Sequence, residues 1–375
     1  MPTMTSEILK TPCSNAGTNV KIEAIESVSE LCQYRDQIDA LSNIPFLKTA
    51  WMFPWIETFC GSRVQLKFVI ALNSEAELIG FAPLVLRRSM KKGKRFCFVG
   101  SGKACADYMT FPVSPQYKQV FLRCFSEWLI ANRNDWDRLE LDGAVDGDPT
   151  FQELTTLLKD LDCRVTTMPT PDSWRLDLPD SWEELLGTLS KNSRKKYRRL
   201  NRSLEGKAEL HRATDADSFR QGFRIFEKLH TARWESLGEE GCFGHEGFGE
   251  FLRGTAKEHL ESNSLSLIWL TIDGQPIAAD IAFYNDTGAF TYQGGISPEY
   301  LDLEPGRAIL KSQIESAIER RCQFIDFLRG DEPYKARFNA TGIKNSRLEI
   351  AAPTTRARMI DSMLRIGRLV KSSLE

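Results

Sequence analysis

Two kinds of hydrophobic pattern alternate along the chain. Short apolar runs between polar turns predict buried strands, and longer segments with apolar residues every three or four positions predict amphipathic helices. In the first half we expect strands over 20–27, 64–72, 78–86, 95–99, 108–113, 138–141 and 163–167, and helices over 29–41, 115–131 and 151–161. In the second half we expect helices over 216–237, 248–260 and 307–320, and strands over 265–272, 277–284, 289–294 and 323–328. This mixture predicts an α/β fold with mixed sheets.

The order of elements in the first half returns in the second half. Ser114 precedes a predicted helix whose following strand carries Asp142, and Ser297 precedes a helix whose following strand carries Asp326, at nearly the same spacing. A repeated order of elements indicates repeated structural units. We therefore expect two copies of one mixed α/β unit, with Asp142 and Asp326 on equivalent strands.

The chain of 375 residues is long enough for more than one domain. We expect a disordered tail over 1–18, a first unit over 19–178, a basic linker helix over 179–206, a second unit over 207–352 and an amphipathic C-terminal helix over 353–375. That last helix is basic and apolar, so it fits either packing on its own domain or binding to a membrane surface. No apolar stretch is long enough to span a bilayer.

Composition narrows the classes of function. Lys plus Arg is 49 and Asp plus Glu is 51, which gives a net charge of −2 and argues against a DNA-binding protein. The 9 cysteines are scattered without a Cys-x-x-Cys pair, and the 4 histidines form no two-histidine helical motif. We therefore expect no metal site and cysteines in the reduced state. The N-terminus is polar and lacks the apolar core of a secretory signal, so we also expect a cytoplasmic protein. The oligomeric state stays open.

The segment between the two predicted units is strongly basic. Ser181 can cap a helix, and an apolar stripe runs through Leu189 and Leu200. Around this stripe lie Lys191, Arg194, Lys195, Lys196, Arg198, Arg199 and Arg202. These charges form either a solvated helix face or a surface that attracts an anionic substrate. On the second interpretation, Arg194 and Arg198 are substrate-binding candidates.

A second candidate region is the strand-to-helix turn formed by Pro305, Gly306, Arg307 and Ala308. Backbone N–H groups and the helix dipole at such a turn can hold a phosphate. An ordinary Pro-Gly turn before a helix has the same pattern.

The buried strand that follows contains Asp326, which must be hydrogen-bonded or functional. Arg329, Tyr334 and Lys335 come after it, at the carboxyl end where open α/β sheets bind ligands.

Further candidates lie elsewhere on predicted elements. His230, Arg233 and Trp234 lie on one helix face, where His230 either acts as a base or packs on Trp234. Asp107 and Tyr108 begin a predicted strand and could contact an acceptor. Tyr292 on a strand of the second unit lines a site or belongs to the core.

Several segments together resemble a known family. They are 306–310, 324–330 and 334–338, with 45–46 and Trp51, the basic segment 190–204, and the stretch that begins at Leu229 and ends at Phe243. From Pro45 to Phe338 the chain resembles GNAT-superfamily acyltransferases with a duplicated fold, the CelD-like acetyltransferases associated with cellulose biosynthesis, which are distantly FemABX-like.

The resemblance implies two tandem GNAT-like domains with a cleft between them, and direct acyl transfer in that cleft. The donor would be acetyl-CoA or another acyl-CoA as co-substrate, with no permanently bound cofactor, and the acceptor a polysaccharide or cell-envelope precursor. A Fem-type enzyme would use aminoacyl-tRNA instead, but the net charge and the lack of an inserted helical arm count against tRNA. A binding protein without catalysis, in a polysaccharide synthesis system, is the other alternative.

The resemblance also suggests roles for individual residues. Tyr334 would protonate the leaving thiolate, and Lys335 would offset negative charge on the donor or oxyanion. Asp326 would be the base or would orient it, or it braces the loop at Arg329. One departure is the phosphate turn, where the family's Gln/Arg-x-x-Gly-x-Gly/Ala pattern is reduced to Gly306, beside a proline that has no N–H.

Overall fold

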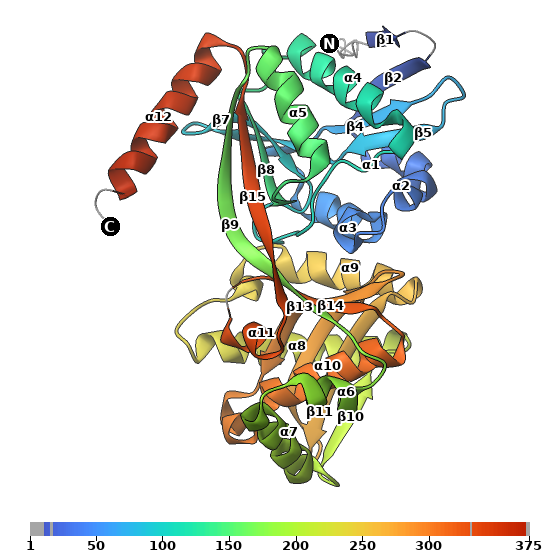
Figure 1. The fold of residues 1–375 in the computed structure, drawn as a ribbon, viewed down its shortest axis with the longest axis vertical. Coiled ribbons are helices and arrows are strands. Elements are labelled where there is room, and N and C mark those ends of the chain that lie inside the picture. The colour runs from blue at the N-terminus through green and yellow to red at the C-terminus, as the bar shows by residue number, and fades with distance from the viewer. Residues whose placement is uncertain (1–10, 16–17, 331, 373–375) are drawn as a thin grey trace. The chain divides into compact units, whose positions relative to one another are not determined.

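The computed structural model describes residues 11–15, 18–330 and 332–372. These residues form two compact units, drawn in Figure 1. The first unit runs to Thr170 and includes the chain from Asn345 onward, and the second runs from Pro171 to Lys344. The boundaries fall inside two long strands, β9 (Arg164–Asp177) and β15 (Thr341–Ala351). They differ from the expected ones because β15, which the apolar pattern did not predict, returns the chain to the first unit.

The first unit contains two sheets. One has the order β1-β2-β4-β5, and the other contributes β15-β8-β7-β6-β3. The strands are β1 (Thr11–Asn15), β2 (Thr18–Ile25), β3 (Val64–Leu66), β4 (Phe68–Leu72), β5 (Leu78–Ala82), β6 (Leu84–Ser89), β7 (Gly93–Phe98) and β8 (Arg138–Val145). The helices are α1 (Val28–Leu31), α2 (Arg35–Leu41), α3 (Thr49–Phe59), α4 (Lys118–Ala131), α5 (Pro149–Asp160) and α12 (Thr355–Ser372). Strand β1 includes part of the stretch expected to be disordered, and the rest of that stretch, apart from Thr18, lies outside the described residues.

The second unit is one mixed sheet covered by helices. The strand order is β10-β11-β12-β13-β14-β9, antiparallel except for the parallel pair β13 and β14. The strands are β10 (Ala208–Arg212), β11 (Leu265–Ile272), β12 (Gln275–Tyr284), β13 (Gly288–Ile296) and β14 (Phe324–Arg329). The helices are α6 (Trp182–Thr188), α7 (Lys191–Leu204), α8 (Ala216–Glu235), α9 (Phe248–Glu261), α10 (Pro305–Glu319) and α11 (Pro333–Arg337).

The α/β class with mixed sheets is confirmed, and most predicted elements are present, with β11 at the predicted bounds. The strand predicted over 108–113 is wrong. Tyr108 has a φ of 59°, in the left-handed region that interrupts an extended chain. Near that segment the described residues show only an isolated bridge between Gly80 and Val113.

The basic segment is two helices rather than a single linker helix. Helix α6 ends at Thr188, and Ser190 caps α7 by accepting a hydrogen bond from the Ser193 N–H at 3.2 Å. The expected cap at Ser181 is present, because its hydroxyl accepts from the Glu184 N–H at 3.2 Å. Both helices and Leu189 between them bury apolar side chains in the core of the second unit; on the helices these are Trp182, Leu185, Leu186, Tyr197 and Leu200. The segment is therefore part of that unit.

The predicted repeat is confirmed at the level of strands. Strand β8 pairs in parallel with β7 and antiparallel with β15, as β14 pairs in parallel with β13 and antiparallel with β9. Asp326 is the third residue of its strand, and the third residue of β8 is Glu140 rather than Asp142. Both carboxylates are paired with an arginine, Glu140 with Arg95 at 2.7 Å and Asp326 with Arg175 at 3.0 Å.

Helix α12 turns its arginines, rather than its apolar stripe, toward the first unit. Arg358 pairs with Asp162, and Arg368 pairs with Glu349 at 2.7 Å. Met363 is 69% exposed, and Met359, Ile366, Leu369 and Val370 are also exposed. Among the helices of the described residues, none combines the length and the apolar character needed to cross a bilayer.

Candidate active site

A cavity of about 330 Å³ lies in the second unit beside the start of α10. Five elements and the residues next to them form its wall. The lining residues are Ser193, Tyr197, Asp280, Gly294, Gly295, Ile296, Gly306, Arg307, Ile309, Leu310, Tyr334, Arg337 and Phe338. It therefore brings together Tyr334 and the turn at Gly306 and Arg307, which the sequence predicted separately, and it adds Asp280.

Two glycines on β13 make room for this arrangement. Gly294 and Gly295 are paired with Asp280 and Ala279 of β12, and successive residues of a strand face opposite sides of the sheet. A Cβ on Gly295 would lie 2.4 Å from the backbone nitrogen of His230, so only glycine lets α8 pack this closely. A Cβ on Gly294 would lie 3.1 Å from Oδ2 of Asp280, within the pocket. Helices α8 and α10 thus cover opposite faces of these strands (Figure 1).

Asp280 is the acidic side chain of the pocket wall. Its Oδ1 accepts a hydrogen bond from Nε2 of Gln313 on α10 at 2.8 Å. Burial raises the pKa of the Asp280 carboxyl to about 7, against a smaller lowering by the Gln313 bond. A carboxyl with this pKa exchanges its proton near neutral pH. The sequence analysis missed Asp280, although it is an aspartate inside an apolar strand, the signal that had drawn attention to Asp326.

Tyr334 supplies a phenol to the same pocket. It lies on α11 and packs on the core, with its ring 5.8 Å from that of Phe327. Burial is the largest cause that raises its pKa above the ordinary value, and the negative charges of Glu332 and Asp280 raise it further. The Tyr334 hydroxyl is therefore protonated at neutral pH and can donate a hydrogen bond.

At the start of α10, Arg307 of that helix and Arg199 of α7 share one glutamate, Glu304. The backbone N–H groups of Arg307 and Ala308 both bond to the Glu304 carbonyl, at 2.9 and 3.2 Å. Nε of Arg307 donates to one carboxylate oxygen of Glu304 at 3.2 Å, and Nη2 of Arg199 donates to the other at 3.3 Å. Pro305 has no N–H to offer. An anion bound here would compete with Glu304 for the arginines and the positive helix end.

The basic helix α7 borders the pocket through Ser193 and Tyr197. Arg194, one of the predicted binding residues, donates to the carbonyls of Gly187 and Leu189 at 3.0 and 2.7 Å and so caps the end of α6. Arg198, the other, is exposed. Of the two, Arg198 remains available to an approaching anion.

Asp326 and Lys335 lie near the pocket residue Tyr334 in the sequence, but their side chains do not line the pocket. The Asp326 side chain is fully buried and accepts from Nε of Arg175 at 3.0 Å and from the Leu328 N–H at 2.9 Å. The Lys335 ammonium donates to the carbonyls of Leu328, Arg329 and Gly330, each at 3.1 Å. These bonds hold the end of β14, where Leu328 has a left-handed φ of 57°. The geometry therefore favours the interpretation of Asp326 as a brace for the loop at Arg329. Lys335 was expected beside the negative charge of the donor or oxyanion, but its ammonium instead binds backbone carbonyls at the end of β14.

His230 is fully buried on the other side of β13, and its ring nitrogen Nε2 accepts from Nε1 of Trp234 at 3.0 Å. The Cys242 sulfur lies 3.2 Å from the same nitrogen. Burial lowers the pKa of His230 to about 4, so the ring is neutral. This geometry matches the structural interpretation of His230.

The other candidates also lie outside the pocket wall. Arg233 follows His230 on α8, and the Tyr292 ring packs 5.8 Å from Phe283. Arg329 ends β14, where its carbonyl receives Lys335. Asp107 and Tyr108 belong to the first unit, where Asp107 is buried.

Residues 191–336 match the family described as acetyltransferase (GNAT) domain. In this part the chain is similar to that family. It includes Ser193, Asp280, Arg307 and Tyr334 of the pocket. No curated protein matches the sequence.

Solved structures resemble most of the chain. A structure titled "Crystal structure of FemX" has a TM-score of 0.63 and 12% identity, covering 87% of this chain and 98% of that one. A conserved protein of unknown function from Bacteroides thetaiotaomicron has a TM-score of 0.54 and 13% identity, covering 85% and 97%. The C-terminal domain of a putative lysylphosphatidylglycerol synthetase from Agrobacterium fabrum has a TM-score of 0.53 and 9% identity, covering 90% and 96%. At these identities the likeness concerns the fold.

Proposed function

We propose that the second unit transfers an acyl group from acetyl-CoA or another acyl-CoA to an amine or hydroxyl acceptor. The observation that carries this proposal is the pairing of Asp280 and Tyr334 in one pocket at the start of α10. One group takes up a proton near neutral pH and the other holds its proton, as base and acid of one reaction must. The GNAT family match over this region supports the reaction class.

In the proposed mechanism, the acceptor nitrogen or oxygen attacks the thioester carbonyl while its proton moves to the Asp280 carboxylate. The new C–N or C–O bond forms, the C–S bond breaks, and the Tyr334 hydroxyl donates its proton to the departing thiolate. Protonation of Asp280 removes a negative charge that raises the pKa of Tyr334, so the first transfer assists the second. Asp280 then returns its proton to Tyr334, which restores both groups.

The positive charges near the pocket suggest where the anionic part of the donor binds. Arg307 lines the pocket and Arg199 reaches the same glutamate, so phosphate groups that displace Glu304 would meet both arginines and the helix start. The remaining cations of α7 would attract the donor over a longer range.

For the acceptor, we propose a polysaccharide or cell-envelope precursor, and a cytoplasmic site of action. The support is the resemblance of 306–338 and the basic segment to CelD-like acetyltransferases. The second candidate function is transfer from an aminoacyl-tRNA, which the likeness in fold to FemX favours.

The test uses the full chain with acetyl-CoA, longer acyl-CoA thioesters and charged tRNA as alternative donors, and nucleotide sugars and amino sugars as acceptors. Mass spectrometry of the products avoids a thiol-reactive dye, which the protein's own cysteines would consume. We expect Asp280→Asn and Tyr334→Phe each to lower kcat by roughly 10²–10⁴-fold. Tyr300→Phe, which removes a hydroxyl that does not line the pocket, should keep full activity. Full activity in both pocket variants would refute the proposal, and exclusive use of charged tRNA would favour the second candidate.

A further inference from the structure

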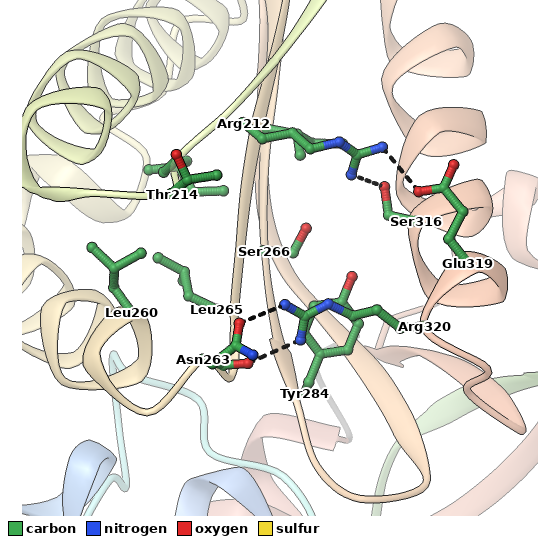
Figure 2. A pocket seen from close by; sticks show the side chains of 13 residues that line it. Arg212, Thr214, Leu260, Asn263, Leu265, Ser266, Tyr284, Ser316, Glu319 and Arg320 are labelled. Atoms are coloured by element: carbon green, nitrogen blue, oxygen red, sulfur yellow. Dashed lines mark hydrogen bonds and ion pairs between the residues drawn. The ribbon is translucent and has the colours of Figure 1, made fainter.

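The second unit has another hollow of about 300 Å³, lined by residues of β11 and of the last turns of α10 among others. Figure 2 shows Ser266 and Tyr284 among its lining side chains, with Arg212 and Arg320 to either side of Ser266. Arg320 is held by Asn263 at 2.9 Å, and its guanidinium lies 4.3 Å from the centre of the Tyr284 ring. The two hollows share no lining residue.

A chain of hydrogen bonds nevertheless connects them. The Ser266 hydroxyl donates to Oε1 of Gln313 at 2.7 Å, and Nε2 of Gln313 donates to Oδ1 of Asp280 at 2.8 Å. Tyr284 also hydrogen-bonds to Ser266 through its side chain. Gln313 is fully buried and Ser266 is 7% exposed, so water does not replace these bonds.

The direction of the chain follows from the chemistry of its members. A glutamine amide donates only through its nitrogen and accepts only through its oxygen. Because the hydroxyl of Ser266 donates to the oxygen of Gln313, the nitrogen of Gln313 must face Asp280. The reverse orientation would set the amide oxygen against the ionised carboxylate, which also has only acceptors to offer.

We propose that Gln313 and Ser266 are positioning residues for Asp280, which hold its carboxylate toward the pocket and set the pH at which it accepts a proton. This inference rests on the proposed function of Asp280 as the base. Gln313 acts on the carboxylate directly, and Ser266 acts through Gln313.

The effect of the Gln313 hydrogen bond on the Asp280 pKa can be separated from that of the other charged groups around the pocket. The charged and titratable side chains of the wall are Arg307 from α10, Tyr334 and Arg337 from α11, and Tyr197 from α7. Two effects shift the Asp280 pKa. Burial raises it, and the hydrogen bond from Gln313 lowers it because it favours the ionised carboxylate. Losing that bond should therefore move the Asp280 pKa further up, by roughly one pH unit for a hydrogen bond to a charged group.

The experiment compares Gln313→Met, which keeps the size and removes the amide, with Ser266→Ala and the control Ser316→Ala. Ser316 lies on the same helix but bonds to Arg212 and to the Ser312 carbonyl. The first readout is the titration of the Asp280 carboxyl in the ligand-free full chain, from infrared difference spectra against Asp280→Asn. The second is the acidic limb of kcat/KM for the acyl-CoA reaction.

We expect the carboxyl titration to move up by roughly one pH unit in Gln313→Met, by less in Ser266→Ala, and not at all in Ser316→Ala. The acidic limb of kcat/KM should move with it, and activity should recover at higher pH. If Gln313→Met does not fold, Ser266→Ala still tests the direction of the shift. An unmoved carboxyl titration in folded variants overturns the inference. A titration that moves without the kinetic limb supports the chain of bonds and refutes Asp280 as the base.

Discussion

The raised pKa of Asp280 predicts that this residue costs the protein stability above neutral pH. The carboxyl titrates at about 7 in the folded protein, against an ordinary value of 3.8. Between these two pH values the unfolded chain has released the proton and the folded protein has not. Compared with high pH, the neutral carboxyl therefore adds to the free energy of unfolding. This contribution is fully present below pH 3.8 and is lost as the pH rises through about 7.

The size of the effect follows from the same values. At 1.36 kcal/mol for each pH unit between them, the interval from 3.8 to about 7 gives an upper limit of about 4 kcal/mol. Asp280→Asn keeps the size of the side chain and an oxygen for the Gln313 N–H, but it cannot ionise. We expect this variant to match the wild type near pH 4 and to become more stable than it as the pH rises to 7, with a constant difference above pH 8.

Urea unfolding of both proteins at half-unit steps from about pH 4 to 8.5, at constant ionic strength, measures this difference. Gln313 is kept in both, so the hydrogen bond is the same and only the charge differs. The same Asp280→Asn protein should show the lowered kcat in the acyl-transfer assay, which would show that function has kept a destabilising group. A difference in free energy of unfolding that stays flat with pH, or that favours the wild type at pH 8, would refute the reasoning.

Three further outcomes follow from the contacts around the pocket. Lys335→Met should lower the free energy of unfolding by about 3 kcal/mol, because the carbonyls at the end of β14 and Glu332 lose their cation. Urea unfolding measures this change, and a loss below about 1 kcal/mol would contradict the bracing role. Glu304→Gln should tighten binding of coenzyme A about fivefold in calorimetry, since roughly 1 kcal/mol of competition at the helix start is removed, and weaker binding would show that Glu304 orients the arginines instead. The exposed triple variant Lys195→Gln, Lys196→Gln, Arg198→Gln should leave Tm nearly unchanged and weaken coenzyme A binding at low salt only; an equal loss at 1 M salt would argue for direct contacts.

The sequence by itself determined the local elements and the fold class. Apolar periodicity is a local property, so the buried strand over Leu265–Ile272, the helix cap at Ser181 and the order of elements in both units could be predicted before the structure. Tyr334 and the turn at Gly306 could be proposed as site residues in the same way, because each follows a strand in the sequence, and their role stays a prediction. Strand β15 could not be predicted in this way, because its burial depends on pairing with β8, far away in the sequence.

Only the tertiary structure decided which polar residues share a site. Asp280 and Asp326 are both aspartates inside apolar strands, and nothing in their local sequence separates them. Folding places Asp326 against Arg175, where its charge is neutralised, and Asp280 against the amide of Gln313, where it is not. A carboxyl's pKa depends on partners and burial supplied by other elements, and these are fixed only when the strands and helices pack together.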